Sequence, residues 1–127
     1  MGSITMTAVF GFALAAAPAL AGPAVDPVPP EFQGTWNEER EGCGMLVNGT
    51  EITITADRIQ LYDGSGPITV MSHFPDEKGL IIHADITNQE GGADTASVPF
   101  TFFLKADGDE LLQEEEDGNR TRYRCPG

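Results

Sequence analysis

From Phe32 to the C-terminus, apolar and polar residues alternate in short segments, and turn residues separate one segment from the next. Successive side chains of a strand point to opposite faces, so this period of two predicts strands with one buried face. After the first twenty or so residues, no segment shows helical periodicity over ten residues. Many short strands joined by tight turns are typical of an antiparallel meander, and closing the meander removes its exposed edges. The pattern therefore predicts an all-β fold, a seven- to eight-stranded antiparallel up-and-down β-barrel over residues 32–127.

The expected strands are Gln33–Glu38, Glu51–Thr55, Arg58–Tyr62, Ile68–Phe74, Leu80–Thr87, Ala96–Lys105 and Asn119–Cys125, with a shorter strand or connection at Met45–Asn48. A two-residue turn at Ala56-Asp57 would set Ile54 opposite Ile59 and Thr53 opposite Gln60, apolar against apolar and polar against polar. The glycine-rich segment Asp63–Gly66 is expected to form the next turn.

Two Asp-Gly dipeptides predict type I′ turns near the C-terminus. The first, Asp107-Gly108, pairs Leu104 with Leu111 and Lys105 with Glu110. The second, Asp117-Gly118, places three arginines on one face of the last strand, with Arg120 opposite Glu115, Arg122 opposite Gln113 and Arg124 opposite Leu111. Since Leu111 also pairs with a core position, Arg124, together with Arg122, is expected to point toward the inner face.

Residues 1–21 are expected to be a secretory signal peptide. Ile4–Ala17 is almost wholly apolar, Pro18 follows it, and Ala19-Leu20-Ala21 has the small-x-small form of a cleavage site. The apolar run is too short for a transmembrane helix, and no cysteine near the cleavage site supports a lipid anchor. The predicted product is periplasmic or secreted and begins at Gly22. Residues 22–31 then form a proline-rich lead-in, interpreted either as a linker or as an arm that reaches a partner.

The formal net charge is −13, from 20 acidic and 7 basic residues. This balance excludes nucleic acid as a partner, because nucleic-acid binding requires a basic surface. It suits a soluble protein, expected to be a monomer, and it would also suit a cationic partner. The two cysteines, Cys43 and Cys125, are expected to form a disulfide, because an exported chain with an even cysteine count favours one.

An arginine inside a small barrel needs a partner, and the face of a tryptophan is one. Trp36 is the sole tryptophan, so Arg124 is expected to stack on it. Gly34-x-Trp36 on the first strand with arginine on the last resembles the lipocalin and calycin arrangement, which implies that the arginine closes the barrel over the tryptophan. The proline-rich lead-in, Gly-x-Trp and a single disulfide also resemble the Inh-type bacterial metalloprotease inhibitors, which implies an N-terminal arm that enters a protease cleft.

Two functions follow as hypotheses. The first is a non-enzymatic binding module for an apolar or anionic small ligand, with the candidate ligand-binding residues Trp36, Tyr62, Phe100, Phe102, Arg122 and Arg124. The second is inhibition of an exported hydrolase, a metalloprotease or lysozyme, through protein–protein contact.

Catalytic and metal chemistry are not expected. The acidic run Glu114–Asp117, with Asp107, Asp109 and Glu110 nearby, lacks the spaced oxygen ligands of a calcium loop and is interpreted as a solvated hairpin. His73 and His83 are too few for a zinc site, and no nucleophile motif accompanies them. We therefore expect no enzyme activity and no cofactor.

Overall fold

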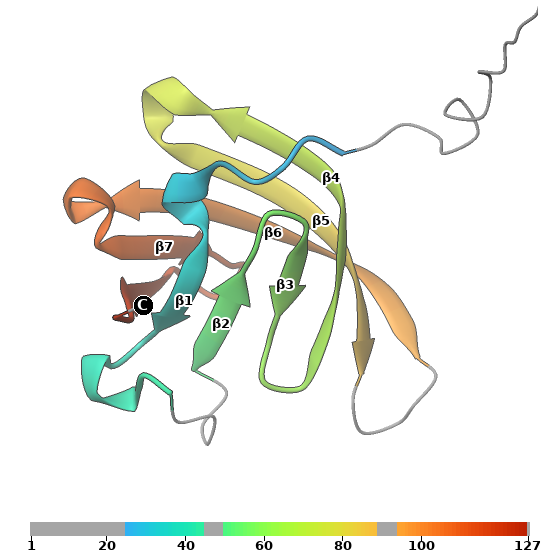
Figure 1. The fold of residues 1–127 in the computed structure, drawn as a ribbon, viewed down its shortest axis with the longest axis horizontal. Coiled ribbons are helices and arrows are strands. Elements are labelled where there is room, and N and C mark those ends of the chain that lie inside the picture. Colours follow the sequence, from blue (N-terminus) through green and yellow to red (C-terminus); the bar gives the residue numbers. More distant parts are fainter. Residues whose placement is uncertain (1–24, 45–49, 89–93, 127) are drawn as a thin grey trace, which may run out of the picture.

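The computed structural model describes residues 25–44, 50–88 and 94–126. Within these residues, eight strands form a closed antiparallel barrel in up-and-down order, as predicted (Figure 1). The strands are β1 (Gly34–Asn37), β2 (Glu51–Ile54), β3 (Arg58–Gln60), β4 (Gly64–Phe74), β5 (Gly79–Asn88), β6 (Thr95–Lys105), β7 (Glu110–Glu114) and β8 (Arg120–Arg124). The helical elements of the described residues are short 3₁₀ turns, η2 (Pro30–Phe32), η3 (Arg40–Gly42), η4 (Pro75–Glu77) and η5 (Ala106–Gly108). None of the helices in this part of the chain is long and apolar enough to cross a membrane.

Two hairpin registers predicted from the sequence are confirmed. Ile54 pairs with Ile59 and Thr53 with Gln60 between β2 and β3, and Leu104 pairs with Leu111 between β6 and β7. Strands β4 and β5 form the long second hairpin. The predicted signal peptide and the expected segment at 45–48 lie outside the described residues.

The expected turn at Asp63–Gly66 is wrong. Gly64 already begins β4, and the tight turn lies just before it, where the Leu61 amide donates to the Gly64 carbonyl at 2.7 Å. The glycines are there because strands approach closely, since a Cβ added to Gly66 would lie 1.7 Å from the backbone oxygen of Asp85 on β5. A glycine inside a strand often marks such an approach rather than a turn.

The predicted register of the last hairpin is wrong by two residues. Arg120 lies opposite Gln113 and Arg122 opposite Leu111, in place of the expected partners Glu115 and Gln113. A two-residue type I′ turn requires positive φ at both central residues, and among the described residues Gly118 has positive φ whereas Asp117 does not. The loop is therefore longer than predicted. Because a shift of two leaves every side chain on its original face, the inner-face placement of Arg122 is retained.

One end of the barrel is closed by residues that precede β1. Val28 and Phe32 are buried in the core, and the Val28 amide donates to the Ala56 carbonyl at the tip of the β2–β3 hairpin. The Trp36 indole Nε1 donates to the Phe32 carbonyl at 3.1 Å. Figure 1 shows this arm crossing the upper end of the barrel before β1 begins. The lead-in from Val28 onward thus packs on its own barrel.

The predicted stacking of Arg124 on Trp36 is confirmed. The two residues pair across the β1–β8 seam, and the Arg124 guanidinium lies 4.2 Å from the centre of the Trp36 ring. Its nitrogens donate to the backbone carbonyls of Glu31, Gln33 and Gly108 at 2.7, 2.9 and 3.1 Å. Gly34 leaves room for this guanidinium, since a Cβ there would lie 3.1 Å from Nη1. Arg124 therefore ties the arm, β1 and the β6–β7 turn together.

The predicted disulfide is confirmed between Cys43 and Cys125, 82 residues apart. It joins the loop after β1 to the residue that follows β8. Strands β1 and β8 are the pair that closes the barrel. Such a bond fits an oxidising, extracytoplasmic compartment. The side chains of the inner face fill the barrel between its two ends, as the alternating pattern predicted; those buried are Ile52, Ile54, Ile59, Ile68, Leu80, Ile82, Ala84, Phe100, Phe102, Leu104 and Leu111.

Candidate functional site

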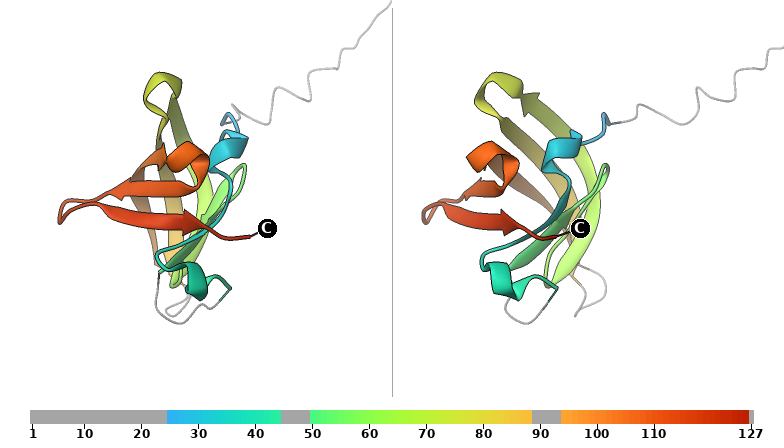
Figure 2. Two further views of the ribbon diagram at one scale, coloured as in Figure 1. Left: turned by 90° about the vertical axis from the view of Figure 1, so that its left-hand side faces the viewer. Right: turned by 60° about the vertical axis from the view of Figure 1, so that its left-hand side comes forward.

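The end of the barrel opposite the arm contains a cavity of about 560 Å³, hereafter the open-end cavity. It lies among the start of β2, the β3–β4 turn, the first half of β6, and the β7–β8 hairpin. Figure 2 shows the β7–β8 hairpin projecting from the side of the barrel. The volume lies within the roughly 300–1,000 Å³ of small-molecule sites. The structure thus has one closed end and, within its described residues, one hollowed end.

One wall of the open-end cavity is apolar. It consists of side chains of β2, β6 and the β3–β4 turn and includes Ile52, Leu61, Val98 and Phe100. Phe100 also packs in parallel with Phe102, with ring centres 5.8 Å apart, which holds its ring in place. Tyr62 stands at the mouth and is half exposed. This wall would hold the apolar part of a ligand.

Arg122 supplies a buried positive charge to the opposite wall. It is only 5% exposed, its Nε donates to the Thr50 carbonyl at 3.0 Å, and its Nη1 donates to Gln113 Oε1. Its Nη2 has no hydrogen-bond partner among the described residues. Arg122 also lines the open-end cavity.

Burial is the main influence on the ionisation of Arg122. It lowers the pKa of the guanidinium to about 10, and nearby Arg120 lowers it further, whereas Glu38 and Glu115 raise it. Arg122 is still a cation at neutral pH. No carboxylate of the described residues lies within 4.0 Å of its nitrogens, so this buried cation faces the open-end cavity without a direct ion-pair partner, although Glu38 and Glu115 act on it from farther away.

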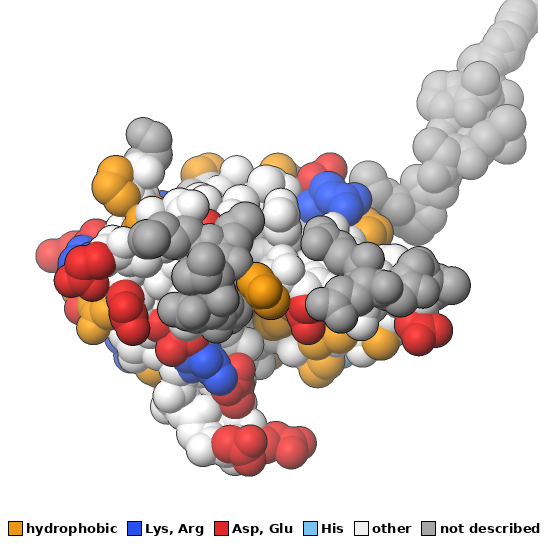
Figure 3. Space-filling view, turned by 90° about the horizontal axis from the view of Figure 1, so that it is seen from below, with side chains coloured by type: hydrophobic (Ala, Val, Ile, Leu, Met, Phe, Trp, Pro, Cys, Tyr) orange, Lys and Arg blue, Asp and Glu red, His pale blue; other side chains and the backbone are white. Residues whose placement is uncertain are grey.

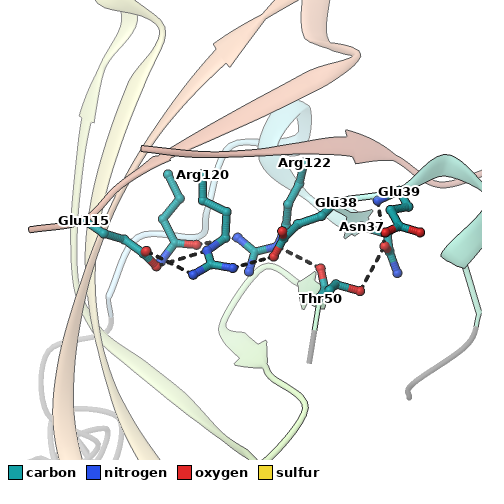
Figure 4. Close-up of polar contacts among 8 residues, drawn as sticks. Asn37, Glu38, Glu39, Thr50, Glu115, Arg120 and Arg122 are labelled. Atoms are coloured by element: carbon teal, nitrogen blue, oxygen red, sulfur yellow. Dashed lines mark hydrogen bonds and ion pairs between the residues drawn. The ribbon is translucent and has the colours of Figure 1, made fainter. Parts of the chain in front are cut away.

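Arg120, two residues earlier on the same face of β8, is neutralised. Its Nη1 is 2.6 Å from Glu38 Oε2 and its Nη2 is 3.2 Å from Glu115 Oε1 (Figure 4). These hydrogen bonds, first that of Glu38 and then that of Glu115, raise the pKa of Arg120. Arg120 thus joins the end of β1 to the β7–β8 hairpin and leaves Arg122 as the available cation.

The carboxylates that line the open-end cavity are either engaged or at its rim. Glu51 is buried, and its Oε1 accepts hydrogen bonds from Asn37 Nδ2 at 3.1 Å and from the Gly44 amide at 2.8 Å. Asp63, Glu114 and Glu116 are exposed at the mouth. Seen from this end, acidic side chains are spread over the described surface and basic ones are few (Figure 3). The cavity therefore has one buried cation, Arg122, and one buried carboxylate, Glu51, inside an acidic rim.

Metal-binding clusters are absent from the part of the chain that the structure describes, where no three His, Cys, Asp or Glu side chains gather. The acidic run Glu114–Asp117 lies by the open-end cavity, whereas Asp109, just before β7, pairs with Arg40 of η3 at 2.9 Å. The two histidines lie apart: His73 contacts the Phe32 ring edge-on, with ring centres 5.8 Å apart, and His83 pairs with Pro99 on β6.

Three of the six candidate ligand-binding residues, Tyr62, Phe100 and Arg122, line the open-end cavity. The other three do not, because Trp36 and Arg124 close the opposite end and Phe102 is fully buried in the core. The sequence interpretation missed further lining residues, among them Ile52, Leu61, Val98 and Gln113. The alternating sequence pattern indicates that such residues face the inside of the barrel, but it does not indicate at which end of the barrel they lie.

No protein-family model, curated protein or solved structure matches this chain. The class of protein is therefore defined by the fold, a small closed eight-stranded antiparallel β-barrel with one disulfide.

Proposed function

We propose that this protein is a non-enzymatic, exported binding protein whose open-end cavity holds a small amphipathic anion. The observation that carries the proposal is Arg122, a buried cation that faces the cavity without a carboxylate partner among the described residues. A carboxylate can accept two hydrogen bonds from one guanidinium, and such charge-assisted bonds are among the strongest in proteins. A ligand carboxylate would supply the missing counter-ion at Nη2.

The apolar wall supports an amphipathic ligand over a simple inorganic anion. A hydrocarbon portion placed against Ile52, Val98 and Phe100 would leave the carboxylate near Arg122. Burial of apolar ligand surface contributes about 25 cal/mol per Å², so even a short chain adds affinity.

The acidic rim opposes the entry of an anion. Exposed charges separated by more than the Debye length, about 8 Å at physiological ionic strength, are largely screened. Contact of the carboxylate with a buried guanidinium is screened much less. Added salt should therefore weaken anion binding less than is usual for an ion pair.

Inhibition of an exported hydrolase is less well supported. The arm that would enter a protease cleft has its own place on the barrel, where Val28 and Phe32 are buried. The acidic surface and the disulfide still suit a rigid partner for a basic enzyme, and inhibition assays against metalloproteases and lysozymes test this alternative directly.

The test of the binding proposal compares three ligands that differ only in their head group: octanoate, octanol and octylammonium. Isothermal titration calorimetry should give octanoate the highest affinity. Octylammonium should bind most weakly at Arg122, although the acidic rim would favour it if the rim were the binding site. Tighter binding of octylammonium would overturn the proposal.

Two matched variants locate the head group. Arg122→Met retains much of the side-chain volume and removes the charge, and it should weaken octanoate by about 10- to 100-fold, the equivalent of one charge-assisted hydrogen bond. Arg58→Met removes an exposed arginine of β3 that does not line the cavity, so it should change the affinity for octanoate far less. Equal effects of the two variants would contradict the assignment of Arg122.

A further inference from the structure

Strand β4 extends beyond its neighbour β3. Its eleven residues end at Phe74, but β3 pairs only with Ser65–Pro67. The last backbone hydrogen bond on this side, within the described residues, runs from the Ile68 amide to the Asp57 carbonyl at 2.8 Å. Figure 1 shows the β4–β5 hairpin rising past the short β3. Residues Thr69–Phe74, hereafter the free edge, therefore have β5 on one side and no strand on the other.

The free edge has little of the protection that exposed strand edges normally carry. Natural edges are blunted by charged side chains, prolines, β-bulges or extreme shortness, and of these the free edge has only the irregularity between Ile68 and Val70 in its pairing with β5. Thr69–Phe74 contains no Asp, Glu, Lys, Arg or Pro, in a chain that has 20 acidic and 7 basic residues. Val70 and Phe74 are 50% and 43% exposed. An uncharged, partly apolar edge of this kind is a template for strand pairing.

The arm of the same chain does not complete the ladder. It passes close by, with Val28 bonded to Ala56 and the Glu31 carboxylate 3.9 Å from His73 Nε2. Its described residues make no backbone hydrogen bond to the free edge. Three of them, Pro27, Pro29 and Pro30, have no N–H to donate. Among the described residues, the N–H and C=O groups of the free edge that point away from β5 thus have no backbone partner in the arm.

We infer that a second copy of this chain occupies the free edge, with the two β4 strands paired antiparallel about a two-fold axis. A two-fold interface uses the same surface on both copies, and main-chain pairing of an added strand is a recurrent mode of association. Two chains of charge −13 repel each other, and the uncharged free edge is where their backbones can approach with least repulsion.

Charges at the two ends of the free edge favour the antiparallel arrangement. Arg58 pairs with Pro67 just before the free edge begins, and Asp76 and Glu77 follow just after it ends. Antiparallel pairing brings Arg58 of each copy close to Asp76 and Glu77 of the other. All three side chains are exposed and have no ion-pair partner among the described residues. Parallel pairing would place the acidic residues of the two copies together.

The size of the free edge sets the expected affinity. Six paired residues give an interface at the low end of stable complexes, so the dissociation constant should be roughly micromolar. Sedimentation equilibrium of the purified protein, with its disulfide intact, should show a reversible monomer–dimer equilibrium in that range. A protein that remains monomeric at a hundredfold higher concentration would overturn the inference.

Two serine-to-lysine variants test the location of the interface. Ser72→Lys adds a charge near the two-fold axis, where it meets its own copy, and should weaken the dimer by more than ~10-fold. Ser97→Lys adds the same charge at an exposed position of β6 and should leave the dimer unchanged. Amide hydrogen exchange of Thr69–Phe74 should slow as the protein concentration rises. A dimer that Ser72→Lys does not weaken, or one without this protection, would show that another surface is used.

Discussion

Arg122 and Arg124 lie on the same face of β8, and exchanging each for methionine should have very different consequences for stability. Arg124→Met removes three hydrogen bonds to backbone carbonyls and the contact with Trp36 at 4.2 Å. At about 1 kcal/mol for each hydrogen bond and about 1–2 kcal/mol for a partly desolvated cation–π contact, the free energy of unfolding should fall by roughly 4 kcal/mol.

Arg122→Met should be nearly neutral. The lowering of the Arg122 pKa from 12.5 to about 10 corresponds to an unfavourable burial of about 3 kcal/mol. The two hydrogen bonds that Arg122 donates return a similar amount. Replacing a buried charge by an apolar side chain is often neutral or stabilising, so we expect a change within about 1 kcal/mol.

Guanidinium denaturation measures the free energy of unfolding of both variants. Trp36, the sole tryptophan, reports unfolding through its fluorescence, and circular dichroism gives an independent signal. In the native state, Arg124→Met should also shift the Trp36 emission, whereas Arg122→Met should not. If Arg122→Met destabilises the protein as much as Arg124→Met does, then Arg122 is a structural residue and the binding proposal loses the observation on which it depends.

Three further outcomes are expected. Reduction of Cys43–Cys125, which closes a loop of 82 residues, should lower the free energy of unfolding by about 4–5 kcal/mol; a midpoint of denaturation unaffected by reductant would contradict the role assigned to the disulfide. Octanoate binding requires the protonated Arg122, so affinity should be constant near neutral pH and fall as the pH rises through about 10; calorimetry that shows no such loss would place the head group elsewhere. Gly66→Ala should destabilise the barrel by at least about 3 kcal/mol, because its Cβ would lie 1.7 Å from the Asp85 oxygen; thermal denaturation with Ser65→Ala as the control measures the difference.

Much of the fold is encoded locally and was predictable. Alternation fixes which face of each strand is buried, and a short turn between two such strands leaves few registers that match apolar with apolar. This is why Ile54 opposite Ile59 and Leu104 opposite Leu111 were predicted correctly. The closure of the barrel was predictable for a different reason: an inner-face arginine needs a partner, and Trp36 is the sole tryptophan.

The two errors arose at glycine-containing segments, because a glycine that suggests a turn can also serve another structural purpose. Asp117-Gly118 has the composition of a type I′ turn, but only Gly118 takes positive φ, and the loop is longer than two residues. Gly64 and Gly66 suggested a turn, but they allow β4 and β5 to approach closely. Local composition does not distinguish these cases, because the deciding contact comes from a strand about 20 residues away.

The open-end cavity could be predicted only in part, because its position depends on how the strands are staggered around the barrel. The alternation of side chains along β8 shows which face of the strand Arg122 is on. Whether Ile52 and Val98 lie at the same end of the barrel as Arg122 depends on how the strands are offset from one another. The free edge of β4 depends likewise on β3 ending after three residues, which no turn signal in the sequence specifies.

The different surroundings of the arginines on β8 are the strongest reason to regard Arg122 as a binding residue. Arg124 is satisfied by backbone carbonyls and the Trp36 ring, and Arg120 by two carboxylates. A chain with 20 acidic residues and 7 basic ones has carboxylates in excess, so the lack of one at Arg122 among the described residues does not reflect a shortage. Burial without a counter-ion costs stability, and such a cost is expected at functional sites, where a ligand offsets it. The closed end makes this possible: with Arg124, the arm and the disulfide holding β1 to β8, the opposite end can retain a cavity and a cation without losing the closure of the barrel.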